Sequence, residues 1–324
     1  KQACVFIGIM IVLSLAINVD RAKATVIEYL TSVVDGEATI TEPKGKMAMR
    51  SSMYITEYTI PEKIGGNPVK GIGNNAFLDM HNIKSVKLPE GLENIGDHAF
   101  GRCWSLTSIE IPNSVKSIGR GAFDKTPWLK EQKEKNEILV LGDGNLYWVS
   151  PDKSGTFVVP KNVKRICAEA FAGCNKLTKI KFSSSIESIG EEAFSGCSSL
   201  VSIEIPGGVE SIGDMAFSGC SSLTGIEGLS EVKRIGVEAF CGCSSLRNIE
   251  LPDGLIYIGK RAFVGCSSLT EITIPGTVRS VLQYTFEKCS SLSCVSMGEG
   301  VKNIAESAFR DCSGLESVKI PNSV

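Results

Sequence analysis

A phenylalanine that recurs every 23 residues constrains the fold of this chain more than any other feature of its sequence. The copies are Phe77, Phe100, Phe123, Phe171, Phe194, Phe217, Phe240, Phe263, Phe286 and Phe309. The one longer step, from Phe123 to Phe171, is a full period plus 25 extra residues. A fixed period of roughly 20 to 50 residues marks a repeat array, in which each unit packs only on its neighbours. The chain is therefore predicted to be a solenoid with one interruption.

Each repeat unit is predicted to hold two short strands on opposite walls of one coil. In one copy, Ile203 and Ile205 alternate with polar residues, which is the period of a strand with one buried face. Pro206 ends this strand because proline has no N–H for the ladder. Val209 and Ile212 form a second apolar pair, after which we expect a turn or a 3₁₀ segment. The side chains predicted to point inward are Leu200, Ile203, Ile205, Val209, Ile212, Phe217 and Cys220.

Leu200, Ile203 and Ile205 form the L-x-x-L-x-L frame of leucine-rich repeats. The motifs Ala-Phe-x-x-Cys, Ile-Pro and Val-x-x-Ile-Gly are added to this frame. With these motifs, residues 55–324 resemble the BspA-like family of bacterial leucine-rich repeat surface proteins. The resemblance implies a mainly β solenoid with short turns or 3₁₀ segments, as a right-handed array of about ten coils. It also implies an adhesin-like role at the cell surface.

The composition agrees with a solenoid that faces water. The formal net charge of the whole chain is −2, so there is no electrostatic basis for binding nucleic acid. Hydrophobic residues make up 43% and charged residues 22%, which suits a packed interior and an ordinary solvated surface.

The first residues have the layout of a secretory signal peptide. An apolar run over 3–16 follows Lys1, and Ala22 and Ala24 form an Ala-x-Ala cleavage site. We expect residues 1–24 to be removed, so that the mature protein is exported and has no membrane span. The alternative is an uncleaved anchor, although the apolar run is short for a span.

Three further segments are predicted. Residues 25–60 lack the repeat and should cap the first coil, with a hairpin indicated by the Asp-Gly pair at Asp35 and Gly36. The solenoid should occupy 61–324, with a hairpin insertion at about 130–154. The sequence stops at Val324 in the middle of a coil, so the natural chain is expected to continue beyond it.

Three aromatic residues lie in or directly before the insertion: Trp128, Tyr147 and Trp148. Exposed aromatic side chains anchor many interfaces, so these residues are candidates for a contact platform. The alternative is that they pack the inserted hairpin onto the coil.

Eight of the twelve cysteines occupy one position, three residues after the repeated phenylalanine. Seven of them stand in consecutive repeats: Cys174, Cys197, Cys220, Cys243, Cys266, Cys289 and Cys312. Stacked copies would have Cα atoms about 5 Å apart but parallel Cβ vectors, which suits a disulfide poorly. We therefore expect free, buried thiols in an interior ladder with Phe171, Phe194, Phe217, Phe240 and Phe263.

No metal, cofactor or catalytic site is indicated. Cys241 and Cys243 stand close together, but the chain has two histidines, His81 and His98, and no second cysteine pair at zinc-finger spacing. Neither histidine belongs to a nucleophile–base motif. We do not expect an enzyme within these residues.

Charged residues form columns on the predicted walls. On the first strand, Lys181 is followed by Glu204, Glu227 and Glu250 at one outward position, with carboxylates stacked about 5 Å apart. Like charges at that spacing destabilise a sheet unless they are solvated, so the column is either a solvated ladder or a contact for a basic partner. On the second strand one column holds Lys116, Lys164, Lys233, Arg279 and Lys302, interrupted by Glu210 and Ile256. This pattern predicts that the two walls differ in charge.

The sequence thus favours a secreted or cell-surface protein that holds an extracellular protein or glycan on the extended face of the solenoid. The candidate contact residues are Glu204, Glu227, Glu250, Lys181, Trp128, Tyr147 and Trp148. Two alternatives stay open: the recognition arm of a larger surface enzyme whose catalytic domain lies beyond Val324, and a structural spacer.

Overall fold

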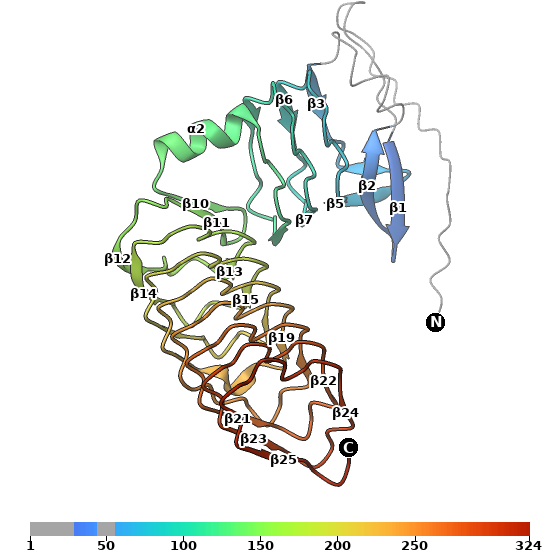
Figure 1. Cartoon of the computed structure of the whole chain (residues 1–324). Coiled ribbons are helices and arrows are strands. Elements are labelled where there is room, and N and C mark those ends of the chain that lie inside the picture. The colour runs from blue at the N-terminus through green and yellow to red at the C-terminus, as the bar shows by residue number, and fades with distance from the viewer. Residues whose placement is uncertain (1–28, 44–55) are drawn as a thin grey trace, which may run out of the picture. The chain divides into compact units, whose positions relative to one another are not determined.

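The structure is a computed structural model that describes residues 29–43 and 56–324 (Figure 1). The predicted signal peptide lies outside these residues. The chain divides into two compact units, which we describe one at a time. The N-terminal unit runs up to Asn136 and includes Leu141–Asn145, and the C-terminal unit comprises Glu137–Val140 and Leu146–Val324. Over the described residues the fold is the predicted β-solenoid, with about 11 turns and almost no helix.

In the C-terminal unit, the first strands of successive coils lie side by side and form the side that we call the first wall. Residues alternate in burial, so that Ser202 and Glu204 are exposed while Ile203 between them is buried. Pairing is parallel and follows the repeat, with Ile203 opposite Ile226. One sheet contains β12(Gly155–Val158), β14(Leu177–Lys181), β16(Ser202–Glu204) and β18(Gly225–Glu227); another contains β21(Glu271–Ile274), β23(Cys294–Met297) and β25(Ser317–Lys319). The segment 248–251, which has no assigned strand, separates the two sheets along the chain.

The second strands form separate sheets on what we call the second wall, and Figure 1 shows β13, β15 and β19 on the other side of the coils from β12 and β14. Most have two residues, an exposed or half-buried one followed by a buried one, such as Ser211 and Ile212. The order in the main sheet is β10(Ile138–Leu141), β11(Asn145–Val149), β13(Arg165–Ile166), β15(Ser188–Ile189), β17(Ser211–Ile212), β19(Arg234–Ile235) and β20(Tyr257–Ile258). A second pair is β22(Ser280–Val281) and β24(Asn303–Ile304).

The turn that carries each repeated phenylalanine closes the coil and is itself bonded from coil to coil. The Phe194 N–H donates to the carbonyl of Ala216, and the Phe217 N–H to that of Ala239, both at 2.8 Å. Gly213, at the start of one such turn, lies against the preceding coil, because a Cβ built on it would stand 2.5 Å from the carbonyl carbon of Gly190. The repeated glycine is therefore required by the close approach of two backbones.

A stack of identical side chains fills the interior of the C-terminal unit. The rings of Phe171, Phe194 and the later copies lie nearly parallel, with centroids 4.8–5.4 Å apart. The repeated phenylalanines from Phe171 to Phe286 are 0% exposed. Because each ring contacts its copy in the coils on either side, burial is completed only by stacking, as in other repeat proteins.

The described part of the N-terminal unit begins with the predicted hairpin. β1(Tyr29–Val34) and β2(Glu37–Pro43) pair in antiparallel fashion, with Asp35 and Gly36 at positive φ in the turn. β2 then pairs in parallel with β5(Asn67–Ile72), the first of three second strands in this unit, so the hairpin covers the edge of that sheet. The remaining strands are β3(Glu57–Thr59), β4(Lys63–Ile64), β6(Ser85–Lys87), β7(Asn94–Ile95), β8(Ser108–Ile109) and β9(Ser117–Ile118).

The extra residues after Phe123 differ from the sequence prediction. They begin with a helix, α2(Pro127–Lys135), whereas the sequence predicted only a hairpin at about 130–154. Thr126 caps the helix by accepting a hydrogen bond from the Leu129 N–H at 3.1 Å, and Pro127 stands in the first turn, where no N–H partner is needed. The predicted pair of strands follows as β10 and β11, which are neighbours in one sheet. Across residues 29–43 and 56–324, no helix has the length and hydropathy to cross a bilayer.

Candidate functional site

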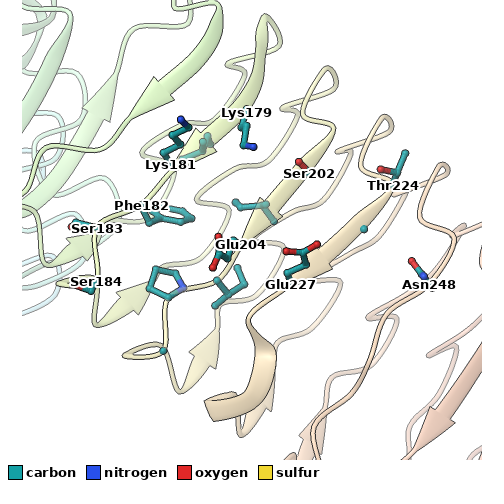
Figure 2. A pocket seen from close by; sticks show the side chains of 16 residues that line it. Lys179, Lys181, Phe182, Ser183, Ser184, Ser202, Glu204, Thr224, Glu227 and Asn248 are labelled. Carbon is teal, nitrogen blue, oxygen red and sulfur yellow. The ribbon is translucent and has the colours of Figure 1, made fainter.

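Two adjoining hollows open on the first wall of the C-terminal unit, with volumes of about 760 and 830 Å³. They share Gly225, Glu227 and Asn248 in their lining. Figure 2 shows the first hollow, which is bordered by side chains from β14, β16 and β18. Each hollow therefore extends across several coils of the first wall.

Two departures from the repeat explain why the wall is hollow here. Gly225 takes the outward position that Lys179 and Ser202 fill in the two preceding coils, so the floor lacks a side chain. A Cβ atom on Gly225 would approach only Oδ1 of Asn248, at 3.8 Å. In addition, Gly228 stands where the preceding coil has Ile205, and η1(Leu229–Glu231) begins where that coil has Pro206. Gly228 has a φ of 79°, a left-handed conformation that favours glycine and changes the direction of the chain where the strand ends.

Charged side chains surround the hollows in a fixed order. Lys179 and Lys181 lie at the end nearer the N-terminus, on β14, and Glu204 and Glu227 lie opposite each other on β16 and β18 (Figure 2). Glu250 follows one repeat later. All five side chains are exposed, and none forms an ion pair within the described part of the chain. The structure thus brings together four of the predicted contact residues, Lys181 and the three glutamates.

The second wall carries its charges differently. In the C-terminal unit, Lys233 Nζ lies 2.8 Å from Glu210 Oε1, and Arg165 Nη2 lies 2.8 Å from Glu187 Oε2. The predicted cationic column therefore contains carboxylates that pair with cations of adjacent coils. The column in this unit holds four cations, Lys164, Lys233, Arg279 and Lys302, and two carboxylates, Glu187 and Glu210, so it stays mainly cationic. The predicted difference in charge between the walls stays a prediction, and the sequence pattern had omitted Glu187.

The N-terminal unit shows the same pairing most clearly. The Glu93 carboxylate accepts hydrogen bonds from Lys70 Nζ at 2.8 Å and from Lys116 Nζ at 2.6 Å, one from the coil on each side. These two hydrogen bonds, with the lysine charges, lower the pKa of Glu93 to about 2. This carboxylate is fully engaged in holding neighbouring coils together.

The aromatic residues of the insertion do not form an exposed platform. Trp128 is 7% exposed and packs against Phe123, with ring centroids 4.9 Å apart. Tyr147 is 8% exposed, and Trp148 is half-buried. Trp128 and Tyr147 are therefore corrected from contact candidates to interior residues. The tryptophan that is 51% exposed is Trp104, which the sequence did not single out because it stands alone at a position that serine holds in most other repeats.

The cysteine column lies in the interior, with its thiols satisfied. From Cys197 to Cys312, each Sγ of the column donates to the carbonyl of a phenylalanine in the preceding coil, for example Cys220 to Phe194 at 3.2 Å. No described cysteine forms a disulfide. Burial raises the pKa of the Cys174 thiol to about 11 and raises those of Cys197, Cys220, Cys243 and Cys266 further. Thiols held in this protonated state are poor nucleophiles and poor metal ligands.

Within the described residues, no three His, Cys, Asp or Glu side chains are grouped so that they could hold a metal ion. His81 lies 3.9 Å from Asp79 at the surface of the N-terminal unit, with half of its side chain exposed. The charged groups around the hollows are suited to binding by charge and hydrogen bonding.

Comparisons with known proteins agree with the geometry. A family model described as "BspA type Leucine rich repeat region" matches residues 45–149, 150–236 and 226–324, in six copies. A leucine-rich repeat protein from Eubacterium ventriosum has a similar structure, with 20% identity, a TM-score of 0.53, and coverage of 93% of this chain and 96% of that one. A leucine-rich cell surface protein from Faecalibacterium prausnitzii is 24% identical, with a TM-score of 0.36 and coverage of 92% and 95%. The comparison with curated proteins gave no match. The family match and these structures are described as repeat proteins, and no enzymatic activity is named for them.

Proposed function

Because the chain belongs to the BspA-type leucine-rich repeat family, we propose that it is an exported bacterial surface protein that binds an extracellular protein or glycan on its first wall. The observation that carries this proposal is the pair of hollows lined by charged side chains without partners. Exposed charges that contribute no contact within the fold are available to a ligand, whereas on the second wall both carboxylates of the column, Glu187 and Glu210, are engaged in ion pairs.

The repeat itself supports the same wall. Inward positions of the first strand hold Ile or Val in successive coils, at Ile203, Ile226 and Ile249 for example. The neighbouring outward position changes from lysine to glutamate to threonine, at Lys181, Glu204 and Thr273. A scaffold with a constant interior and a varied outer face is how repeat proteins build extended binding surfaces.

The test compares one bulky substitution on each wall. Gly225→Trp fills the floor of the hollows, and it should fold because a Cβ there meets nothing closer than 3.8 Å. Ser211→Trp, at an exposed position of β17, is the matched control on the second wall. The full chain is coupled to beads and applied to an array of extracellular matrix proteins and glycans.

We expect the natural chain and Ser211→Trp to bind the same members of the array and Gly225→Trp to lose them. Equal binding by Gly225→Trp would remove the first wall as the site. Binding of the natural chain to no member at all would contradict the proposed function.

A further inference from the structure

We infer that the ligand of the first wall is an extended polypeptide segment that lies along the axis of the coils, with an acidic residue at one end and basic residues at the other. This inference rests on the proposed function and names the chemistry of its ligand. It follows from the order of charges around the two hollows, from their lack of partners and from the geometry of the floor.

The charges are segregated along the axis. Lys179 and Lys181 stand on β14, whereas Glu204, Glu227 and Glu250 occupy the next three coils. At about 4.8 Å per coil, the column from Lys181 to Glu250 spans about 14 Å. One end therefore attracts an acidic group and the remainder attracts basic groups.

The carboxylates of Glu204, Glu227 and Glu250 are arranged so that neighbours repel each other. Glu204 and Glu227 are directly opposite in the sheet, and like charges in that position destabilise a strand pair. On the second wall, by contrast, Glu210 lies beside a lysine of the next coil, so the fold accommodates such pairs readily. A basic ligand would relieve the repulsion on the first wall, which supplies a driving force for association.

The floor is suited to a peptide backbone. β16 already pairs with β14 on one side and with β18 on the other, so a ligand cannot be added as another strand between them. It must lie across the strands, where the side chains of Ser202 and Asn248 border Gly225 and have no hydrogen-bond partner among the described residues. The side chain missing at Gly225 leaves room for a backbone to approach these polar groups.

The same charges disfavour a glycan. Charged sugars of extracellular matrices carry carboxylates or sulfates, which the three glutamates repel. A neutral sugar would have to displace water from five charged groups without replacing their interactions. The one aromatic ring in the lining of the hollows, Phe182, is half-buried and packs edge-on against Phe194 with centroids 6.0 Å apart, so it offers a sugar only part of one ring.

The length of the segment follows from the spacing. In an extended chain, side chains on one face recur about every 6.8 Å, so the column of about 14 Å is matched by about five residues. The probes are therefore two fluorescent five-residue peptides with charged residues at positions one, three and five and glycine between them. One has the order acid, base, base; the other has the same composition in the order base, acid, base.

Binding of both peptides to the full chain is measured by fluorescence anisotropy at low ionic strength. We call the acid, base, base peptide the segregated peptide, and we expect it to bind about fivefold or more tightly than the other. In the other peptide two of the charges face a like charge on the wall, and losing two exposed ion pairs weakens binding on this order. The preference should disappear at about 0.5 M salt, where exposed charges are screened. Two double variants each remove two negative charges. E227Q/E250Q on the first wall should lower the affinity for the segregated peptide about tenfold. E187Q/E210Q on the second wall is the control and should leave that affinity unchanged.

Equal affinity for the two peptides, or equal loss in the two double variants, would overturn the inference. Binding to the array distinguishes the polypeptide ligand from the broader proposal that the first wall is a binding surface. If neither peptide binds while Gly225→Trp still abolishes binding to an array glycan, the polypeptide ligand is wrong and the first wall stands as a binding surface.

Discussion

The two walls of the C-terminal unit share one interior and one backbone pattern, yet the carboxylates in their outward columns are paired on one wall and unpaired on the other. On the second wall, Glu210 and Lys233 of adjacent coils are 2.8 Å apart. On the first wall, Glu204 faces Glu227, and neither carboxylate forms an ion pair among the described residues. Because the repeat constrains only inward residues, outward residues of either wall are free to vary. The difference is the reason why we propose the first wall, and not the second, as the binding face.

The largest effect should come from the interior on which both walls depend. Phe217 is 0% exposed and stacks on Phe194 and Phe240 at 5.1 and 5.4 Å. Phe217→Ala should lower the free energy of unfolding by about 3–5 kcal/mol, as for other buried aromatic residues. Urea denaturation measures this loss, with the exposed Ser211→Ala as the control. A loss below about 1 kcal/mol would mean that the ring does not contribute to a shared core.

The next effect distinguishes two glycines of one coil. Gly213→Ala would bring Cβ to within 2.5 Å of the Gly190 backbone, and forcing the coils apart should cost about 1–3 kcal/mol. A methyl group added to Gly207, beside the first wall, would meet no atom within 4 Å, and Gly207 does not have positive φ. Gly207→Ala should be neutral or stabilise by up to about 1 kcal/mol. Thermal unfolding measures the melting temperatures of the two variants. Equal shifts of the melting temperature in both would contradict the close stacking at Gly213.

A smaller pair of effects tests the walls against each other. Glu210→Gln removes an ion pair and should cost about 0.2–1 kcal/mol. The double variant E204Q/E227Q removes a like-charge contact and should stabilise the protein by a few tenths of a kcal/mol. Both differences should shrink in high salt. If the two variants change stability in the same direction, the contrast between the walls is not electrostatic.

The smallest effect concerns pH and the N-terminal unit. Lys116 and Lys70 hold the pKa of Glu93 near 2, below the 4.5 of an unperturbed glutamate. A carboxylate with a depressed pKa in the folded state stabilises the fold above pH 4.5, and this contribution is lost as the pH falls toward 2. Glu93→Gln should therefore unfold earlier than the natural chain at neutral pH, and the gap should close in acid. A gap that is independent of pH would show that Glu93 contributes by packing alone.

The repeated parts of this fold were predictable because one residue type recurs at one position. Phe217 and Cys220 are buried as the period predicts, and the Asp-Gly pair at Asp35 marks the turn of the first hairpin. Helix α2 was not predicted, although Thr126 and Pro127 supply an N-cap and a first-turn proline. The helix was missed because it has no apolar stripe along its length. Only Trp128 and Leu129, in its first turn, are buried.

The candidate site was predictable only in its charges. Glu204, Glu227 and Glu250 could be assigned to one outward column from the period alone. The hollows depend on Gly225, which removes a side chain, and on Gly228, whose positive φ redirects the chain. Neither consequence follows from the repeat, because both are departures from it. The pairing on the second wall was missed because acidic residues such as Glu187 had not been counted with the lysines of their column.

The contrast between Glu210 and Glu227 can be measured directly with a water-soluble carbodiimide and an excess of a small amine. An activated carboxylate that lies beside a lysine reacts with it to form an isopeptide cross-link, whereas one without a neighbouring amine takes up the amine from solution. Mass spectrometry of the digested native protein should find Glu210 cross-linked to Lys233, 2.8 Å away, and Glu227 as the amine adduct. Cross-linking of Glu227 to a lysine of this chain, or adducts in equal yield at both glutamates, would contradict the claim that the first wall leaves its carboxylates free for a partner.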